Sequence, residues 1–194
     1  MKANIGFAMC GSFCTFSKAI SQIKNLKKLD YNVIPIMSET AFSTDTRFGF
    51  AVDFINKIEK ITGNKIISSI CGAEPAGPEK MFDLLIVAPC TGNTLAKLAG
   101  GITDTAVTMA VKSHLRICRP VLVCAATNDA LGASALNIGR LLNTKHFYFV
   151  PMSQDDTINK PKSLVGDFEL IPECAEAALN GEQIQPVFKT FIKN

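Results

Sequence analysis

Short, almost wholly apolar runs alternate along this chain with longer segments whose apolar residues recur at helical spacing. Strands without charged residues are typical of parallel sheets covered on both faces, because neither face of the strand meets water. The pattern predicts strands at 5–9, 31–37, 84–88 and 120–125, and helices at 15–29, 48–61, 91–99, 105–115 and 130–142. This alternation predicts an α/β fold: a doubly wound, Rossmann- or flavodoxin-like parallel sheet of about six strands with helices on both faces.

The remaining segments carry weaker signals. Segments 65–70 and 147–150 are predicted to be further strands, 154–168 a polar loop and 173–179 a short helix. The chain shows no repeat, low-complexity tract or linker, and its 194 residues fit one domain. We therefore expect a single domain over residues 1–194, with a C-terminal arm from about residue 151 that contacts another subunit.

Composition argues against several classes of protein. The net charge of +3 is small, and the densest lysine cluster is explained by a solvated helix face, so we expect no nucleic-acid partner. No apolar stretch approaches the roughly 20 residues of a membrane span. The seven cysteines are odd in number and form no Cys-x-x-Cys pair, which predicts free thiols in a cytoplasmic compartment. Two histidines without Cys–His spacing predict no metal site.

Small, hydroxylic and amide residues follow four of the predicted strands. They lie at 10–12, 38–40, 89–94 and 126–129. Ligands of doubly wound sheets bind at the carboxyl ends of the strands, where helix N-termini present free N–H groups that suit a phosphate. Asn93 and Asn128 add donor and acceptor groups that suit a heterocycle with imide edges. Simple helix capping is the alternative for any one loop, but four such loops favour a nucleotide-like ligand.

Two familiar phosphate-binding motifs are absent. Gly6 and Gly11 have the spacing of a P-loop, but Phe13 follows Ser12 where that motif needs a Lys-Ser or Lys-Thr pair. There is also no Gly-x-Gly-x-x-Gly turn, so the chain lacks the fingerprint of a dinucleotide-binding domain.

The segment "APCTGNTLAKLAGGITDT" resembles the Pro-x-Ser-Ala-Asn-Thr segment of the FMN-dependent flavoprotein family. That family includes phosphopantothenoylcysteine decarboxylases, lantibiotic-precursor cysteine decarboxylases and flavin prenyltransferases, and the match runs from residue 1 to about 150. The resemblance implies a homo-oligomer with FMN near a subunit boundary. It implies cofactor contacts at Gly11, Ser12, Phe13, Ser38, Pro89, Thr91, Gly92, Asn93, Thr94 and Thr127. A pocket that has lost FMN or holds only phosphate is the alternative.

Two segments depart from the decarboxylases of this family. Those enzymes use a histidine after the second strand, but "SETAFSTDTRFGF" has none, and Ser43 stands near the expected place. They also carry Pro-x-Met-Asn-x-x-Met-Trp, where this chain has "AATNDALG" and retains only Asn128. These departures argue against a self-sufficient FMN-dependent decarboxylase or prenyltransferase.

One branch of the family fits the departures. "TDTRFGFAVDFINKIEKITGNKII", "AEPAGPEKMFDLLIVAP", "FYFVPMSQDD" and "QIQPVF" are similar, essentially end to end, to the flavoprotein-like component of a two-component oxidoreductase. This resemblance implies oxidation of a dihydrodipicolinate-type precursor to dipicolinate during spore formation, in the mother-cell cytoplasm. It also implies that the partner A subunit binds NAD(P).

The product implied by this resemblance is a planar pyridine with two carboxylates. A fork-shaped cation suits a carboxylate, so Arg47 is the predicted partner, with an ordinary surface arginine as the alternative. Asn93 and Asn128 are predicted to orient the ring. The hydride acceptor is either a flavin on this chain or the nicotinamide on the partner. A non-catalytic scaffold with a vestigial flavin site is the remaining hypothesis.

Overall fold

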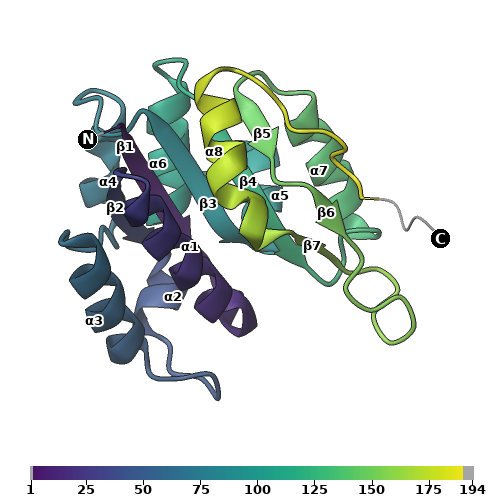
Figure 1. Cartoon of the computed structure of the whole chain (residues 1–194). Coiled ribbons are helices and arrows are strands. Elements are labelled where there is room, and N and C mark those ends of the chain that lie inside the picture. The colour runs from purple at the N-terminus through teal and green to yellow at the C-terminus, as the bar shows by residue number, and fades with distance from the viewer. Residues whose placement is uncertain (1, 190–194) are drawn as a thin grey trace.

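Five parallel strands form the centre of the sheet in this computed structural model, which describes residues 2–189 (Figure 1). They are β1 (Asn4–Met9), β2 (Asn32–Met37), β3 (Leu84–Cys90), β4 (Val121–Thr127) and β5 (Phe147–Phe149). They are arranged in the order β2-β1-β3-β4, and β5 pairs with β4. This is the flavodoxin-like order of a doubly wound sheet, so the predicted fold class is confirmed.

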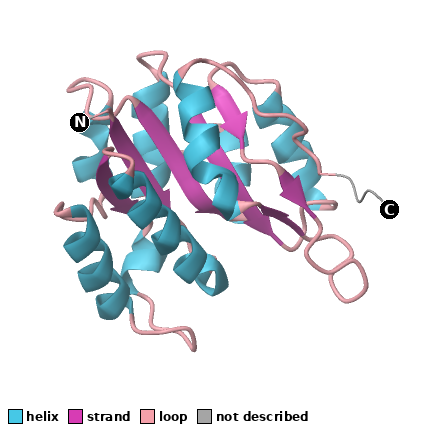
Figure 2. Cartoon of the chain, viewed as in Figure 1, coloured by secondary structure: helices cyan, strands magenta, loops and turns pink. Residues whose placement is uncertain are grey.

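Helices cover both faces of the sheet, as the uncharged strands require (Figure 2). One face carries α1 (Phe16–Lys28), α3 (Ala51–Thr62) and α8 (Ile171–Leu179); the other carries α4 (Ile70–Ala73), α5 (Gly92–Gly100), α6 (Ala106–Leu115) and α7 (Ala133–Leu142). Alternate residues of each strand enter the two cores: Phe7 packs with α1, whereas Ala8 packs on the α6 side. Every residue of β3 and β4 is buried.

Short helices occupy several strand-to-helix connections. They are α2 (Glu39–Ser43) and the 3₁₀ helices η1 (Phe13–Thr15), η2 (Glu74–Ala76) and η3 (Phe168–Leu170). Glycine ends two of the longer helices: Gly63 follows α3 with φ 74° and Gly101 follows α5 with φ 70°. Both lie in the left-handed region that glycine adopts without strain.

The segment at 65–70, predicted to be a strand, is not one. Ile67 alone bridges to β2, accepting from the Met37 N–H and donating to the Pro35 carbonyl. Ser69 then caps α4 by accepting from the Gly72 N–H at 3.1 Å. The cap turns the chain away from β2, so the pairing ends after one residue.

One strand, β7 (Leu164–Gly166), lies within the segment 154–168 that was predicted to be a loop, and another, β6 (Met152–Ser153), lies just before it. β6 and β7 pair antiparallel, and β7 also pairs antiparallel with the end of β4, so the seven-stranded sheet is mixed. Strands of two and three residues are too short to show a period. Gly166 permits the close approach of β7, since a Cβ there would lie 2.7 Å from the Cys124 sulfur.

The predicted C-terminal arm packs on its own sheet through β6, β7 and α8, and a loop at 154–163 projects between β6 and β7 (Figure 1). Contact of this arm with another protomer stays a prediction. All seven cysteines are free thiols. Within residues 2–189, no helix combines the length and the apolar character that crossing a membrane requires.

Candidate functional site

The order in which strands are added to the sheet reverses at β1. The chain leaves β1 for β2 on one side and returns to β3 on the other, which creates the crevice where ligands of such sheets bind. Backbone hydrogen bonds join the loops at this point: the Cys10 N–H donates to the Pro89 carbonyl at 3.2 Å, and the Ser38 N–H donates to the Met9 carbonyl at 3.0 Å. These bonds join three of the four predicted loops, and the fourth, after β4, packs against Gly92 of the loop after β3.

The loop after β1 forms a tight turn that opens α1. The Ser12 carbonyl accepts from the Thr15 hydroxyl at 2.8 Å and from the Thr15 N–H at 3.0 Å. The Phe13 ring packs on the Phe16 ring with centroids 5.1 Å apart, and lies beside Gly11. Gly11, Ser12 and Phe13 are all partly exposed, so they line the loop's outer surface.

Helix capping explains two of the predicted hydroxyl contacts. Ser38 accepts from the Ala41 N–H at 3.2 Å and thereby caps α2. Thr91 accepts from the Thr94 N–H at 3.3 Å, caps α5, and donates to the Thr94 hydroxyl at 3.1 Å. A capping oxygen keeps its own O–H, and the Ser38 hydroxyl donates to no other described residue. The cap and a ligand contact are compatible at Ser38.

The end of β3 places α5 at the crevice. Pro89 is buried, and the peptide bond between Ala88 and Pro89 is cis. Gly92 begins α5, and the first N–H groups of this helix have no partners within the helix. Asn93 is exposed, and no residue of the described chain hydrogen-bonds to its amide. Burial raises the pKa of the Cys10 thiol to about 11, so it is neutral at pH 7.

Glu39 provides a further link that no sequence pattern indicated. Its carboxylate accepts from the Ala106 N–H at 3.0 Å, at the start of α6. Glu39 therefore ties the loop after β2 to the start of α6. A carboxylate at a helix N-terminus is stabilised by the helix dipole.

The loop after β4 is organised around a carboxylate. Asp129 accepts from the Thr127 hydroxyl and, at 2.7 Å, from the Ser134 hydroxyl. These hydrogen bonds lower the pKa of the Asp129 carboxyl. Asn128 beside it is exposed and has no hydrogen-bond partner among residues 2–189. The sequence predicted a ligand-binding loop here but no role for Asp129 or Ser134, because a carboxylate–hydroxyl cluster has no periodic signature.

Comparison with known proteins identifies the family. The family model described as Flavoprotein matches residues 1–162. The chain belongs to the flavoprotein family. This confirms the resemblance predicted from "APCTGNT" and its neighbours.

This flavoprotein is most informatively compared with individual members of the family. It is 43% identical over 183 residues to the B subunit of dipicolinate synthase from Bacillus subtilis (strain 168), covering 94% of this chain and 92% of that protein. The crystal structure of the B subunit of dipicolinate synthase from Bacillus halodurans C superposes with a TM-score of 0.90 at 43% identity, covering 98% of both chains. Burkholderia xenovorans DmrB in complex with FMN shares the fold, with a TM-score of 0.68 at 18% identity, covering 92% of this chain and 96% of that one.

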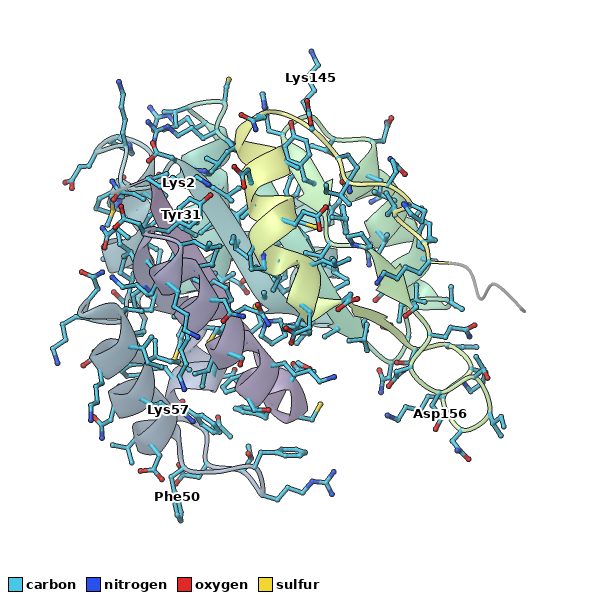
Figure 3. All side chains as sticks on the ribbon, in the orientation of Figure 1. Lys2, Tyr31, Phe50, Lys57, Lys145 and Asp156 are labelled. Carbon is cyan, nitrogen blue, oxygen red and sulfur yellow. The ribbon has the colours of Figure 1, made fainter. Side chains whose placement is uncertain are left out.

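Arg47 belongs to none of the four strand-end loops of this flavoprotein in the sequence. It stands on the connection between α2 and α3, where Thr46 and Gly49 exchange two backbone hydrogen bonds. Its guanidinium carbon lies 4.9 Å from the centroid of the exposed Phe48 ring. Phe50 on the same connection is 62% exposed and points away from the helices (Figure 3). Among the described residues, no hydrogen bond joins Arg47 to Asn93 or Asn128.

Two cavities of the flavoprotein lie elsewhere. One of about 260 Å³ is lined by Lys18, Ser153, Asp155 and residues 165–169. Another of about 330 Å³ lies beside α5 and α6, lined mainly by apolar side chains such as Ile102 and Phe147. The strand-end loops line neither of these two cavities. In the described part of the chain, no three His, Cys, Asp or Glu side chains are grouped to hold a metal ion.

Proposed function

We propose that this chain is the B subunit of a dipicolinate synthase. Together with a nicotinamide-binding A subunit, it oxidises a dihydrodipicolinate-type precursor to dipicolinate during spore formation. The observation that carries the proposal is the 43% identity to the B subunit of the Bacillus subtilis enzyme across 94% of this chain. The TM-score of 0.90 over 98% of both chains supports the same assignment.

The donor groups at the switch point fit FMN. The four strand-end loops contain no Lys or Arg, so a phosphate there would be held by backbone N–H groups and hydroxyls. Gly11, Ser12 and Ser38 would hold the phosphate side. Pro89, Thr91, Gly92, Asn93, Thr94, Thr127 and the Phe13 ring would contact the rest of the cofactor. FMN, when bound, accepts an electron pair; the FMN complex of DmrB shows that this fold accommodates it.

The chain's own residues would bind and orient the substrate. Aromatising a dihydropyridine removes a hydride and a proton from the ring, so the ring must be held with one C–H bond towards the acceptor. Asn93 and Asn128, whose amides are exposed and unbonded within the described chain, would fix that orientation. Arg47, on the connection between α2 and α3, would bind a carboxylate of the substrate.

An assembly would complete this site. Both asparagines are exposed, and a protomer seated over them would exclude water from the reacting ring. We propose that the chain forms a homo-oligomer that also binds the A subunit, which carries NAD(P). DmrB, which shares the fold, is a cubic protein cage. The proposed location is the cytoplasm of the mother cell.

Titration with FMN tests the cofactor assignment. We expect saturable perturbation of the visible flavin band, and roughly tenfold weaker binding for Asn93→Ala, because one polar contact to the ligand is lost. Asn56→Ala, at an exposed position of α3, is the matched control and should bind as the wild type does. A wild-type chain that leaves the flavin spectrum unchanged at all concentrations would remove FMN from the proposal.

Replacement of Arg47 tests the carboxylate partner. In the complex with the A subunit, Arg47→Ala is expected to raise the KM for the dicarboxylate about tenfold, because a charge-assisted contact is lost. Arg140→Ala, at an exposed position of α7, is the control and should leave the KM unchanged. Unchanged KM and kcat in Arg47→Ala would exclude Arg47 from substrate binding.

The other candidate activities have distinct products. A self-sufficient decarboxylase would release carbon dioxide from a cysteinyl peptide without the A subunit, and a prenyltransferase would consume a prenyl phosphate. A scaffold protein would leave the rate of the A subunit unchanged when any strand-end residue is replaced. No observation favours these alternatives over the proposed function.

A further inference from the structure

Two exposed amides of the candidate site stand on different loops. Asn93 lies in the first turn of α5, and Asn128 follows β4. A ligand that contacts both amides depends on the distance between these loops. The group that sets this distance therefore controls binding without touching the ligand.

The two loops meet at Gly92. A Cβ on Gly92 would lie 2.7 Å from the Thr127 hydroxyl, 2.8 Å from the nearer Asp129 carboxylate oxygen and 2.8 Å from the Ser134 hydroxyl. Distances this short leave room only for hydrogen, so the start of α5 packs directly on the polar cluster after β4. The contact joins residues more than thirty positions apart.

Asp129 is the centre of that cluster. Its carboxylate accepts from both hydroxyls, and its backbone carbonyl accepts from the Gly132 N–H at 2.8 Å and the Ser134 N–H at 3.3 Å. Thr127 and Ser134 are nearly buried, at 9% and 2% exposure, so few other partners are available to their hydroxyls. A buried hydroxyl that loses its acceptor is destabilised, which favours rearrangement of the loop.

We propose that Asp129 is a positioning residue, which holds Asn128 at a set distance from Asn93 by clamping the loop after β4 onto Gly92. This inference rests on the proposed function, because it takes the two amides as ligand contacts. Asp129 itself touches no ligand in this scheme.

A double-mutant cycle tests the proposal. Asp129→Ala is expected to weaken FMN binding about tenfold in the wild-type background but less than about twofold in an Asn128→Ala background, because a positioning residue acts through the residue it positions. Asp129→Asn, which retains one acceptor oxygen, should recover part of the affinity. Gly92→Ala should weaken binding similarly by wedging the loops apart, whereas Gly139→Ala, which meets no atom within 4 Å, should not.

Asp156→Asn is the matched control. That carboxylate accepts from two N–H groups and a side-chain amide within its own loop, and it lies at the projecting segment between β6 and β7 (Figure 3). It should bind FMN as the wild type does. Multiplicative effects of Asp129→Ala and Asn128→Ala would overturn the proposal, as would full affinity in Asp129→Ala.

A second measurement separates this inference from the proposed function. In the ligand-free protein, nuclear Overhauser contacts between the Gly92 α-protons and the Thr127 side chain should be present in the wild type and lost in Asp129→Ala. If these contacts persist in Asp129→Ala, the clamp is overturned whether or not FMN binds. Failure of the wild type to bind FMN, with the clamp lost in the variant, would count against the cofactor assignment alone.

Discussion

Gly77→Ala is expected to destabilise the chain by at least about 3 kcal/mol, because the added methyl group collides with the backbone of α6. A Cβ on Gly77 would lie 2.1 Å from the Ser113 carbonyl oxygen, and a backbone atom cannot rotate away. The same residue donates its N–H to the Ser113 hydroxyl at 2.9 Å, and that hydroxyl donates to the Glu74 carbonyl. Both hydrogen bonds would be disturbed when η2 is pushed from α6.

Urea denaturation of Gly77→Ala and Gly139→Ala checks this prediction. Gly139 lies at an exposed position of α7 with nothing within 4 Å of an added Cβ, so its replacement by alanine should leave stability unchanged or raise it by up to about 1 kcal/mol. Equal stability of the two variants would contradict the close approach of η2 and α6.

Acidification is expected to destabilise the chain by up to about 3 kcal/mol between pH 6.5 and pH 4, owing to His114. This side chain is fully buried in α6, and burial lowers its pKa from 6.5 to about 4. Its Nε2–H donates to the Pro120 carbonyl at 3.0 Å, while Nδ1 is buried without a partner. The unfolded chain therefore binds a proton below pH 6.5 that the folded chain does not, and stability falls as the pH falls.

Unfolding free energies of His114→Gln across this pH range provide the check. The variant should lose most of the pH dependence between pH 6.5 and about pH 4.5, since glutamine does not titrate. His146→Asn is the control; residue 146 has a φ of 69°, which asparagine tolerates. An identical slope in His114→Gln and the wild type would contradict the prediction. If the variant folds poorly, NMR titration of the His114 ring in the wild type provides the check, and the ring should titrate near pH 4.

Local patterns predicted most of the fold. β3 and β4 were predicted because every position in them is apolar or small, and α3 because its apolar face and Gly63 mark its course and its end. The elements that were predicted wrongly depend on contacts between distant residues. Ile67 bridges to β2 for one residue only, and β7 depends on Gly166 fitting against Cys124, so both pairings depend on distant contacts rather than on periodicity.

The candidate site shows the same division. The loops after β1, β2, β3 and β4 could be located from sequence, since the carboxyl ends of parallel strands share one edge. The hydrogen bonds between these loops could not be predicted from sequence. They join the ends of neighbouring strands, as Cys10 bonds to Pro89 and Ser38 bonds to Met9. The roles of individual site residues, Arg47 among them, stay predictions.

The sequence by itself determined the parallel α/β sheet, the position of the ligand-binding edge and membership of the flavoprotein family, because each follows from contiguous patterns of residues. Only the tertiary structure decided that Asp129 meets Gly92 and that Glu39 reaches α6. Such contacts join residues far apart along the chain, and their geometry depends on how the finished sheet and helices pack.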